Sequence, residues 1–207
     1  MKLVEELRDL KKVVWVLTGN GPTECRVLKG SVKKYDGSEK VLFFPKIPLG
    51  FQFGSGTSVL KVIKVYVSKY NANNFFCLLD KEHIETSKPS EMEIGDRLKE
   101  FGITVDNLEK LSVNDEEALR VEGKVGIHKF ALWIAINGKE KCIEENIAKL
   151  LKIEFGENIK PTKEAIRNAL RNHNIEDLEH LVSNVSINKI ERSFPAIHTV
   201  LSRLEDN

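Results

Sequence analysis

The sequence predicts an α/β protein with a mostly parallel sheet of Rossmann-like type, followed by a helical C-terminal extension. Two patterns support this prediction. Short, fully apolar runs alternate with segments of helical spacing between residues 13 and 105, and such runs are typical of strands that helices cover on both faces. From residue 143 onward the spacing of apolar residues is mainly helical. Right-handed crossovers are expected between the parallel strands.

The N-terminal part predicts a helix, a strand and a second helix. MKLVEELRDLKK has the pattern of an amphipathic, charged helix. Val13–Leu17 is a continuous apolar run and predicts a buried strand. After a turn at Thr18–Gly21, Pro22 stands where the first residue of a helix tolerates proline, and helical spacing continues to Tyr35.

The next segment predicts a second, a third and a fourth strand. Val41–Phe44 and Phe75–Leu79 are apolar and predict strands, whereas Ile103–Val105 predicts a short one. Between them, Thr57–Tyr70 is rich in valine but places its apolar residues on one helical face, so we expect a helix. Met92–Phe101 predicts another helix, closed by the glycine that follows.

The last third of the chain predicts a hairpin and then helices. Ala118–Gly123 and Ile127–Ile136 are strand-like runs expected to form an antiparallel hairpin that extends the sheet. Ile143–Ile153 predicts an amphipathic helix, and three further helical runs follow residue 161. We therefore expect a core over residues 1–156, with an N-terminal helix and a C-terminal hairpin, and a helical extension over residues 157–207 that packs on it.

The composition excludes several classes of protein. The chain has 207 residues, of which 41% are hydrophobic and 30% charged, which is typical of a soluble globular domain. The longest apolar run, Phe130–Ile136, is far shorter than the roughly 20 residues of a membrane helix. The charged N-terminus does not resemble a secretion signal, so we expect a cytoplasmic protein without a membrane partner. Three widely spaced cysteines favour neither disulfides nor a zinc site.

Acidic residues follow two strands of the predicted sheet. Asn20 and Glu24 follow the first strand, and Asp80 and Glu82 follow the third. Ligands of parallel sheets bind beyond the carboxyl ends of the strands, so these groups should meet if the two strands are neighbours. Mg²⁺ prefers oxygen ligands, including one or two carboxylates. Glu24, Asp80 and Glu82 are therefore candidate ligands of Mg²⁺ and candidate catalytic residues.

Residues near the first acidic group suit phosphate. The Gly19-Asn20-Gly21 turn at a helix N-terminus offers backbone donors to an anion. Lys29 and Lys33, with Lys34, lie on the helix that follows and could hold a nucleic-acid backbone. Residues 1–80 carry 13 Lys and Arg against 7 Asp and Glu, whereas the remainder carries 19 against 24. A basic N-terminal part is compatible with a polyanionic partner.

Two motifs resemble those of the TOPRIM domain found in primases, topoisomerases and OLD-type nucleases. GNGPTE at residues 19–24 lies between an apolar strand and a helix, and FFCLLDKE at residues 75–82 follows after a further strand and helix. In the nuclease-like branch the first motif has two glutamates and the second has two aspartates. The resemblance spans roughly residues 13–136 and implies a TOPRIM-like fold and a Mg²⁺ site that acts on nucleic-acid phosphodiesters.

The family's site residues carry over position by position. Glu24 matches the second glutamate of the first motif, Asp80 the first aspartate of the second motif, and Glu82 its second aspartate. Asn20 stands where the family has its first and most characteristic glutamate. That departure leaves two alternatives open: a nuclease-like enzyme, or a degenerate domain that binds nucleic acid or a protein partner without turnover. A third alternative is a protein that binds small phosphate-bearing molecules.

Each of these residues also has a structural explanation. An acidic residue such as Glu24 in the first turn of a helix complements the helix dipole. Asp80 and Glu82 could be polar because the strand ends at solvent. His83 could assist proton transfer, although a histidine that follows a strand is commonly a surface residue. The glycines at residues 54–58 favour a turn, because a P-loop lysine is missing.

Overall fold

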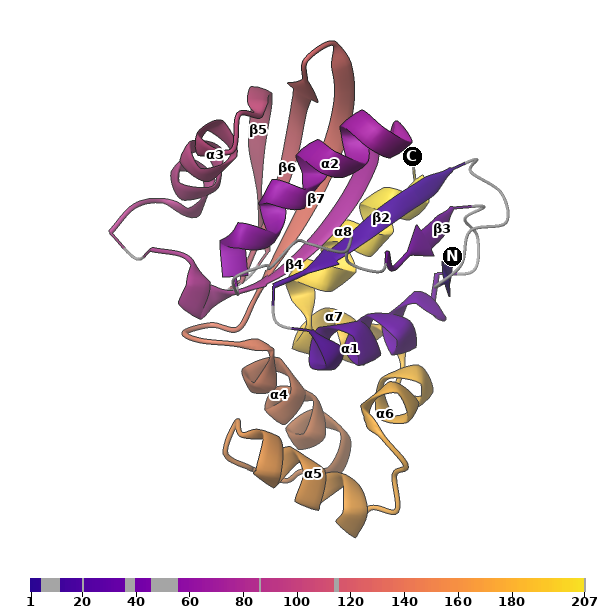
Figure 1. Cartoon of the computed structure of the whole chain (residues 1–207). Coiled ribbons are helices and arrows are strands. Elements are labelled where there is room, and N and C mark those ends of the chain that lie inside the picture. Colours follow the sequence, from indigo (N-terminus) through magenta and orange to yellow (C-terminus); the bar gives the residue numbers. More distant parts are fainter. Residues whose placement is uncertain are drawn as a thin grey trace.

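The computed structural model describes residues 1–4, 12–19, 21–35, 40–45, 56–85, 87–113 and 116–206. Within these residues a single sheet carries helices on both faces (Figure 1). This arrangement confirms the α/β class predicted from the sequence.

Seven strands of the described chain form the sheet. They are β1 (Lys2–Val4), β2 (Val13–Thr18), β3 (Val41–Phe43), β4 (Asn74–Asp80), β5 (Thr104–Val113), β6 (Glu116–Val125) and β7 (His128–Asn137). Their order across the sheet is β1-β3-β2-β4-β7-β6-β5. The first five strands in this order, β1, β3, β2, β4 and β7, pair in parallel. β6 pairs antiparallel with β7, and β5 pairs antiparallel with β6. The sheet is mostly parallel, as predicted.

Helices connect the strands and make up the C-terminal part. The α-helices of the described chain are α1 (Pro22–Val32), α2 (Lys61–Tyr70), α3 (Ser90–Glu100), α4 (Ile143–Phe155), α5 (Lys163–Asn172), α6 (Leu178–Asn184), α7 (Ile187–Ser193) and α8 (Pro195–Asp206). Two short 3₁₀ helices, η1 (Gly56–Leu60) and η2 (Lys81–His83), precede α2 and follow β4. The helix predicted over residues 57–70 is therefore confirmed.

The sheet separates two hydrophobic cores. Val16 of β2 and Phe76 of β4 enter the core that contains side chains of α1, α4, α5, α6 and α8. Their neighbours Trp15 and Phe75 point to the other face, where α2 and α3 cover the sheet. Because successive side chains of a strand alternate between faces, fully apolar runs are required here. This explains why the central strands were recognisable in the sequence.

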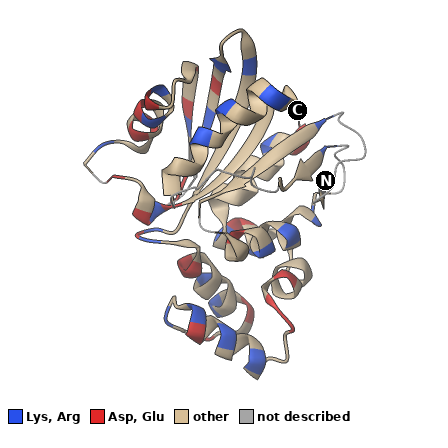
Figure 2. Cartoon of the chain, viewed as in Figure 1, with Lys and Arg blue, Asp and Glu red and all other residues tan. Residues whose placement is uncertain are grey.

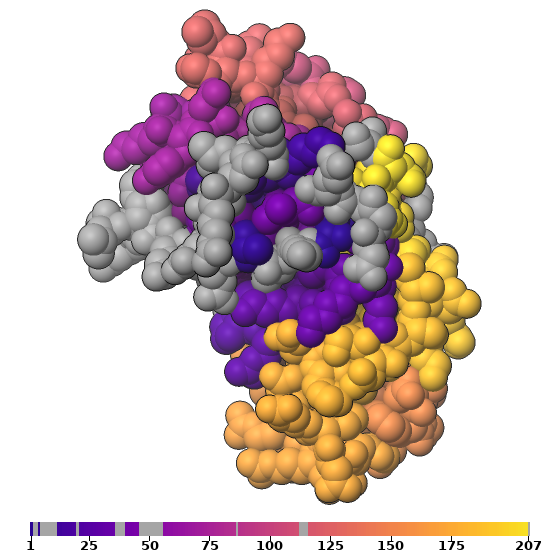
Figure 3. Space-filling view, turned by 90° about the vertical axis from the view of Figure 1, so that its right-hand side faces the viewer, coloured from indigo at the N-terminus to yellow at the C-terminus, as the bar shows by residue number. Residues whose placement is uncertain are grey.

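The C-terminal helices share a core with the parallel strands. In the space-filling view the orange and yellow C-terminal helices lie directly against the purple surface of α1 (Figure 3). Gly30 of α1 allows this approach, because a Cβ atom at that position would come within 2.7 Å of Cβ of Val182 on α6. In Figure 1, α4, α5 and α6 lie together beyond one end of the sheet.

Two predictions from the sequence were wrong in detail, and a third was incomplete. Residues 2–4 form strand β1, paired with β3, where an N-terminal helix was predicted; residues 5–11 lie outside the described part. The short strand at 103–105 is the start of the ten-residue β5, which is antiparallel. The predicted hairpin is confirmed, because β6 and β7 pair antiparallel. The parallel pairing of β7 with β4 was not predicted.

These differences have physical causes. β1 and β5 are edge strands, for which partner strands matter more than apolar content. β5 is rich in polar residues; Lys110, for example, forms an ion pair with Glu117 of β6 at 3.2 Å. A bulge between Val105 and Asn107 also interrupts its alternation.

None of the helices in the described part of the chain has the length and hydrophobicity that a membrane crossing requires.

Candidate active site

The two strands that precede the acidic motifs are neighbours. β2 and β4 pair in parallel, with Thr18 opposite Leu78, and the backbone N–H of Gly19 donates to the carbonyl of Leu78 at 3.0 Å. β3 and β4 lie on opposite sides of β2 in the sheet. The connection from β2 to β3 contains α1 and the connection from β3 to β4 contains α2, and these two helices cover opposite faces of the sheet. Such a point of divergence in a parallel sheet is where ligands bind.

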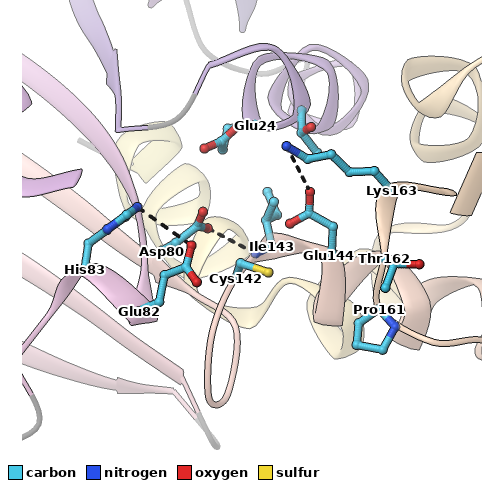
Figure 4. A pocket seen from close by; sticks show the side chains of 11 residues that line it. Glu24, Asp80, Glu82, His83, Cys142, Ile143, Glu144, Pro161, Thr162 and Lys163 are labelled. Atoms are coloured by element: carbon cyan, nitrogen blue, oxygen red, sulfur yellow. Dashed lines mark hydrogen bonds and ion pairs between the residues drawn. The ribbon is translucent and has the colours of Figure 1, made fainter. Parts of the chain in front are cut away.

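A pocket of about 510 Å³ opens at this point (Figure 4). Its walls come from the start of α1, the end of β4 with η2, the start of α4 and the start of α5. The lining residues are Thr23, Glu24, Asp80, Glu82, His83, Cys142, Ile143, Glu144, Pro161, Thr162 and Lys163. All three acidic residues that the sequence singled out line this pocket, together with Glu144. Among the described residues, the ligand atoms close enough to share one ion are those of Asp80, Glu82 and His83, and Glu24 is not in that group.

Glu24 is buried in this pocket without a partner for one of its oxygens. Its exposed fraction is 2%, and its Oε1 has no hydrogen-bond partner among the described residues. Burial, together with smaller contributions from the charges of Asp80 and Glu144, raises the pKa of Glu24 to about 7. A hydrogen bond from its own backbone N–H and the charge of Lys163 oppose this rise in pKa. A structural carboxylate at this depth would be expected to be fully hydrogen-bonded.

Asp80 joins β4 to α4. Its side chain is 3% exposed, and Oδ1 accepts a hydrogen bond from the backbone N–H of Ile143 at 3.0 Å. The backbone N–H groups at the start of a helix need acceptors, and the N-cap residue of α4, Cys142, provides none from its side chain. The carboxylate of Asp80, at the end of β4, takes that place. Asp80 therefore has a structural role in addition to any catalytic one.

Glu82 and His83 form the more exposed side of the pocket. One ligand atom each from Asp80, Glu82 and His83 lie within 4.8 Å of one another. Nε2 of His83 is 3.9 Å from Oε1 of Glu82. A Cβ atom at Gly56 would come within 2.6 Å of the His83 ring, so glycine lets the start of η1 approach this side chain. The predicted turn at residues 54–58 is described only from Gly56 onward.

The side of the pocket that α4 and α5 form was not predicted from the sequence. Glu144 is buried in the first turn of α4, and its Oε1 lies 3.8 Å from Nζ of Lys163. Burial, with a contribution from Glu144, raises the pKa of the Cys142 thiol to about 12. Glu144 follows β7, which the sequence analysis assigned to an antiparallel hairpin. Recognising β7 as a parallel neighbour of β4 would have placed Glu144 at the same edge.

The residues predicted to bind phosphate lie around the start of α1 and along this helix. The N–H of Gly19 is used within the sheet, Gly21 is the N-cap residue of α1 with a φ of 110°, and Asn20 lies outside the described residues. Lys29 lies on α1 with its side chain partly buried, whereas Nζ of Lys33 is 2.9 Å from Oε1 of Glu179 on α6. The role of these residues in binding phosphate stays a prediction.

Comparison with known proteins identifies no relative. No protein-family model matches the chain, and no curated protein or solved structure matches it. The resemblance to the TOPRIM domain therefore rests on the two sequence motifs alone.

The residues present fit a divalent cation. The pocket offers carboxylate oxygens from Glu24, Asp80, Glu82 and Glu144, and one of the buried oxygens has no partner among the described residues. Carboxylates are ligands for Mg²⁺ and Mn²⁺, and Mn²⁺ can also accept the imidazole of His83. A cation would offset the burial of the Glu24 charge, which is the main cause of its raised pKa, and the smaller repulsion from Asp80 and Glu144.

Proposed function

We propose that the chain is a Mg²⁺-dependent, TOPRIM-like protein that hydrolyses phosphodiester bonds of nucleic acid. The observation that carries the proposal is the buried side chain of Glu24, which lines a pocket rich in carboxylates and whose Oε1 has no hydrogen-bond partner among the described residues. In its ionised form such a carboxylate destabilises the folded chain unless a cation compensates its charge. The strand-end position of the pocket and the two TOPRIM-like motifs support the same proposal.

Glu24, Asp80 and Glu82 are the proposed ligands, and Glu144 adds negative charge beside them. When bound, the cation would polarise a phosphoryl oxygen and orient water for attack. Asp80 is held in place by the N–H of Ile143, so its second oxygen keeps a fixed position. Lys163 has a side chain that is 77% exposed and lies at the rim beside Glu144, where its ammonium group can contact a substrate phosphate.

The test is calorimetric titration with Mg²⁺ or Mn²⁺, followed by incubation of the same samples with plasmid DNA and structured RNA. Asp80→Asn is the sharpest variant, because the remaining amide oxygen can still accept from Ile143 while the charge is lost. We expect wild type to bind the cation and cleave, and Asp80→Asn to lose both while keeping its thermal stability. Equal cation binding by wild type and Asp80→Asn, or unchanged cleavage by Asp80→Asn, would refute the proposal.

The principal alternative is a degenerate TOPRIM-like domain that binds nucleic acid or a protein partner without turnover. It is favoured by Asn20, which stands where the family has a glutamate. The variant Asn20→Glu separates the two functions. Cleavage that appears only in Asn20→Glu would favour the degenerate domain, whereas cleavage already present in wild type would exclude it.

A further inference from the structure

Helix α5 is fixed to the protein by one face only. Ile166, Ala169 and Leu170 are buried in the core that α5 shares with α4 and the sheet. Its N-terminus is capped by Thr162, whose Oγ1 accepts from the N–H of Ala165 at 3.3 Å. The opposite face of α5 is therefore held toward solvent in a defined orientation.

One side of the exposed surface of α5 is basic. Lys163, Arg167 and Arg171 are exposed and follow one another at intervals of four residues, which places them on one side of the helix. We call these three residues the α5 basic face; Figure 2 shows blue Lys and Arg gathered on α5. Across the described chain, Arg97 and Arg120 are paired with glutamates, whereas neither Arg167 nor Arg171 has an ion-pair partner there.

The α5 basic face begins at the candidate active site. Lys163 lines the pocket and lies 3.8 Å from Glu144. Arg171 lies eight residue steps beyond Lys163, so the positive charge extends about 12 Å along the helix axis. Cationic side chains in a row that ends at a cluster of carboxylates match a linear polyanion with one of its phosphates at a metal site.

We propose that the α5 basic face binds the phosphate backbone of a polynucleotide and directs it into the pocket. This inference rests on the proposed function, of which it names the substrate class: a polymer extending several nucleotides beyond the scissile phosphate. The other exposed residues of α5, Glu164, Asn168 and Asn172, are polar. A helix that binds a membrane exposes apolar side chains, and the centre of a protein interface is depleted of charge. A polynucleotide therefore fits better than either.

The test measures binding of fluorescent single-stranded and duplex oligonucleotides in EDTA, where cleavage does not interfere. The double variant Arg167→Ala/Arg171→Ala is compared with Lys69→Ala/Lys129→Ala, which loses the same charge from exposed residues at the opposite end of the sheet. We expect the slope of log Kd against log salt to fall by about 1.4 for a single strand in the α5 variant, and affinity to fall about tenfold or more. The control variant should stay within about twofold of wild type.

Equal losses in the two variants, or no oligonucleotide binding by wild type, would overturn the inference. Binding of wild type to vesicles of phosphatidylserine and phosphatidylcholine, lost in the α5 variant while oligonucleotides do not bind, would overturn it in favour of a membrane. Titration with Mn²⁺ distinguishes failure of this inference from failure of the proposed function. The α5 variant keeps all four pocket carboxylates, so it should bind Mn²⁺ as wild type does. Salt-dependent binding through α5 without any cleavage would contradict only the hydrolytic function.

Discussion

Two buried glutamates differ in what surrounds them. Glu24 lines the pocket and Oε1 has no partner among the described residues. Glu116, at the start of β6, accepts hydrogen bonds from Nδ2 of Asn146 on α4 and, at 3.3 Å, from the N–H of Ala196 on α8. Burial raises the pKa of each to about 7.

The difference teaches that burial and a raised pKa do not by themselves mark a functional residue. Glu116 joins β6, α4 and α8, and its two oxygens supply acceptors to buried N–H groups, including one at the N-terminus of α8. Its burial is explained by the fold. Glu24 has no comparable set of donors, and its neighbours include Asp80 and Glu144, which repel its charge. We propose that a bound cation accounts for its burial.

The largest effect is expected on turnover. Glu24→Gln keeps the size of the side chain but removes a proposed cation ligand, so metal-dependent cleavage should fall by at least about 1,000-fold, or ~4 kcal/mol in the activation barrier. Glu116→Gln changes a carboxylate outside the pocket and should keep cleavage within about tenfold of wild type. Single-turnover kinetics with Mn²⁺ measure both. If folded Glu116→Gln lost more cleavage activity than this, the distinction between the two glutamates would be wrong.

The next effect is on stability against pH. An unfolded glutamate ionises near pH 4.5, but folded Glu24 ionises near 7. The stabilisation from keeping this side chain neutral is therefore complete below pH 4.5 and is lost as pH rises to 7. Without metal, Glu24→Gln should be more stable than wild type above pH 7 by about 3 kcal/mol, an order-of-magnitude value.

Above pH 7 and without metal, Glu116→Gln should gain less stability relative to wild type than Glu24→Gln does, or should lose stability. One amide oxygen cannot serve both Asn146 and Ala196, and an unpaired buried donor costs about 1–3 kcal/mol. Denaturant unfolding in EDTA at several pH values measures both variants. Adding Mn²⁺ should then stabilise wild type and Glu116→Gln but not Glu24→Gln. The opposite ranking in EDTA would show that Glu24 is satisfied by groups within the protein.

The smallest effect concerns Lys163. Its charge lowers the pKa of Glu24, so Lys163→Ala should raise it, by less than about one pH unit because the lysine is exposed to solvent. The acidic limb of the profile of cleavage rate against pH should therefore move to higher pH. The pKa of Glu116 should stay unchanged. A carboxyl chemical-shift titration of both glutamates by NMR measures the shift. A downward shift of the Glu24 pKa would contradict the charge arrangement of the pocket.

The sequence was informative where burial alone fixes the structure. β2 and β4 are covered on both faces, so their apolar runs were evident. The two strands are neighbours, and Glu24, Asp80 and Glu82 line one pocket at their ends. Edge strands β1 and β5 were misread because pairing determines them more than composition. Glu144 and Lys163 were missed because the position of β7 beside β4 depends on long-range pairing, which the local pattern of residues 127–136 does not contain.

The most direct test is a crystal grown above pH 7 and soaked in Mn²⁺, examined by anomalous scattering. If the buried carboxylate serves a cation, an anomalous peak will lie within coordination distance of Oε1 of Glu24 and of Asp80, and will be missing in Glu24→Gln. A peak held only by the exposed Glu82 and His83, or none in the pocket of a wild-type crystal, would contradict the assignment of Glu24 as a metal ligand.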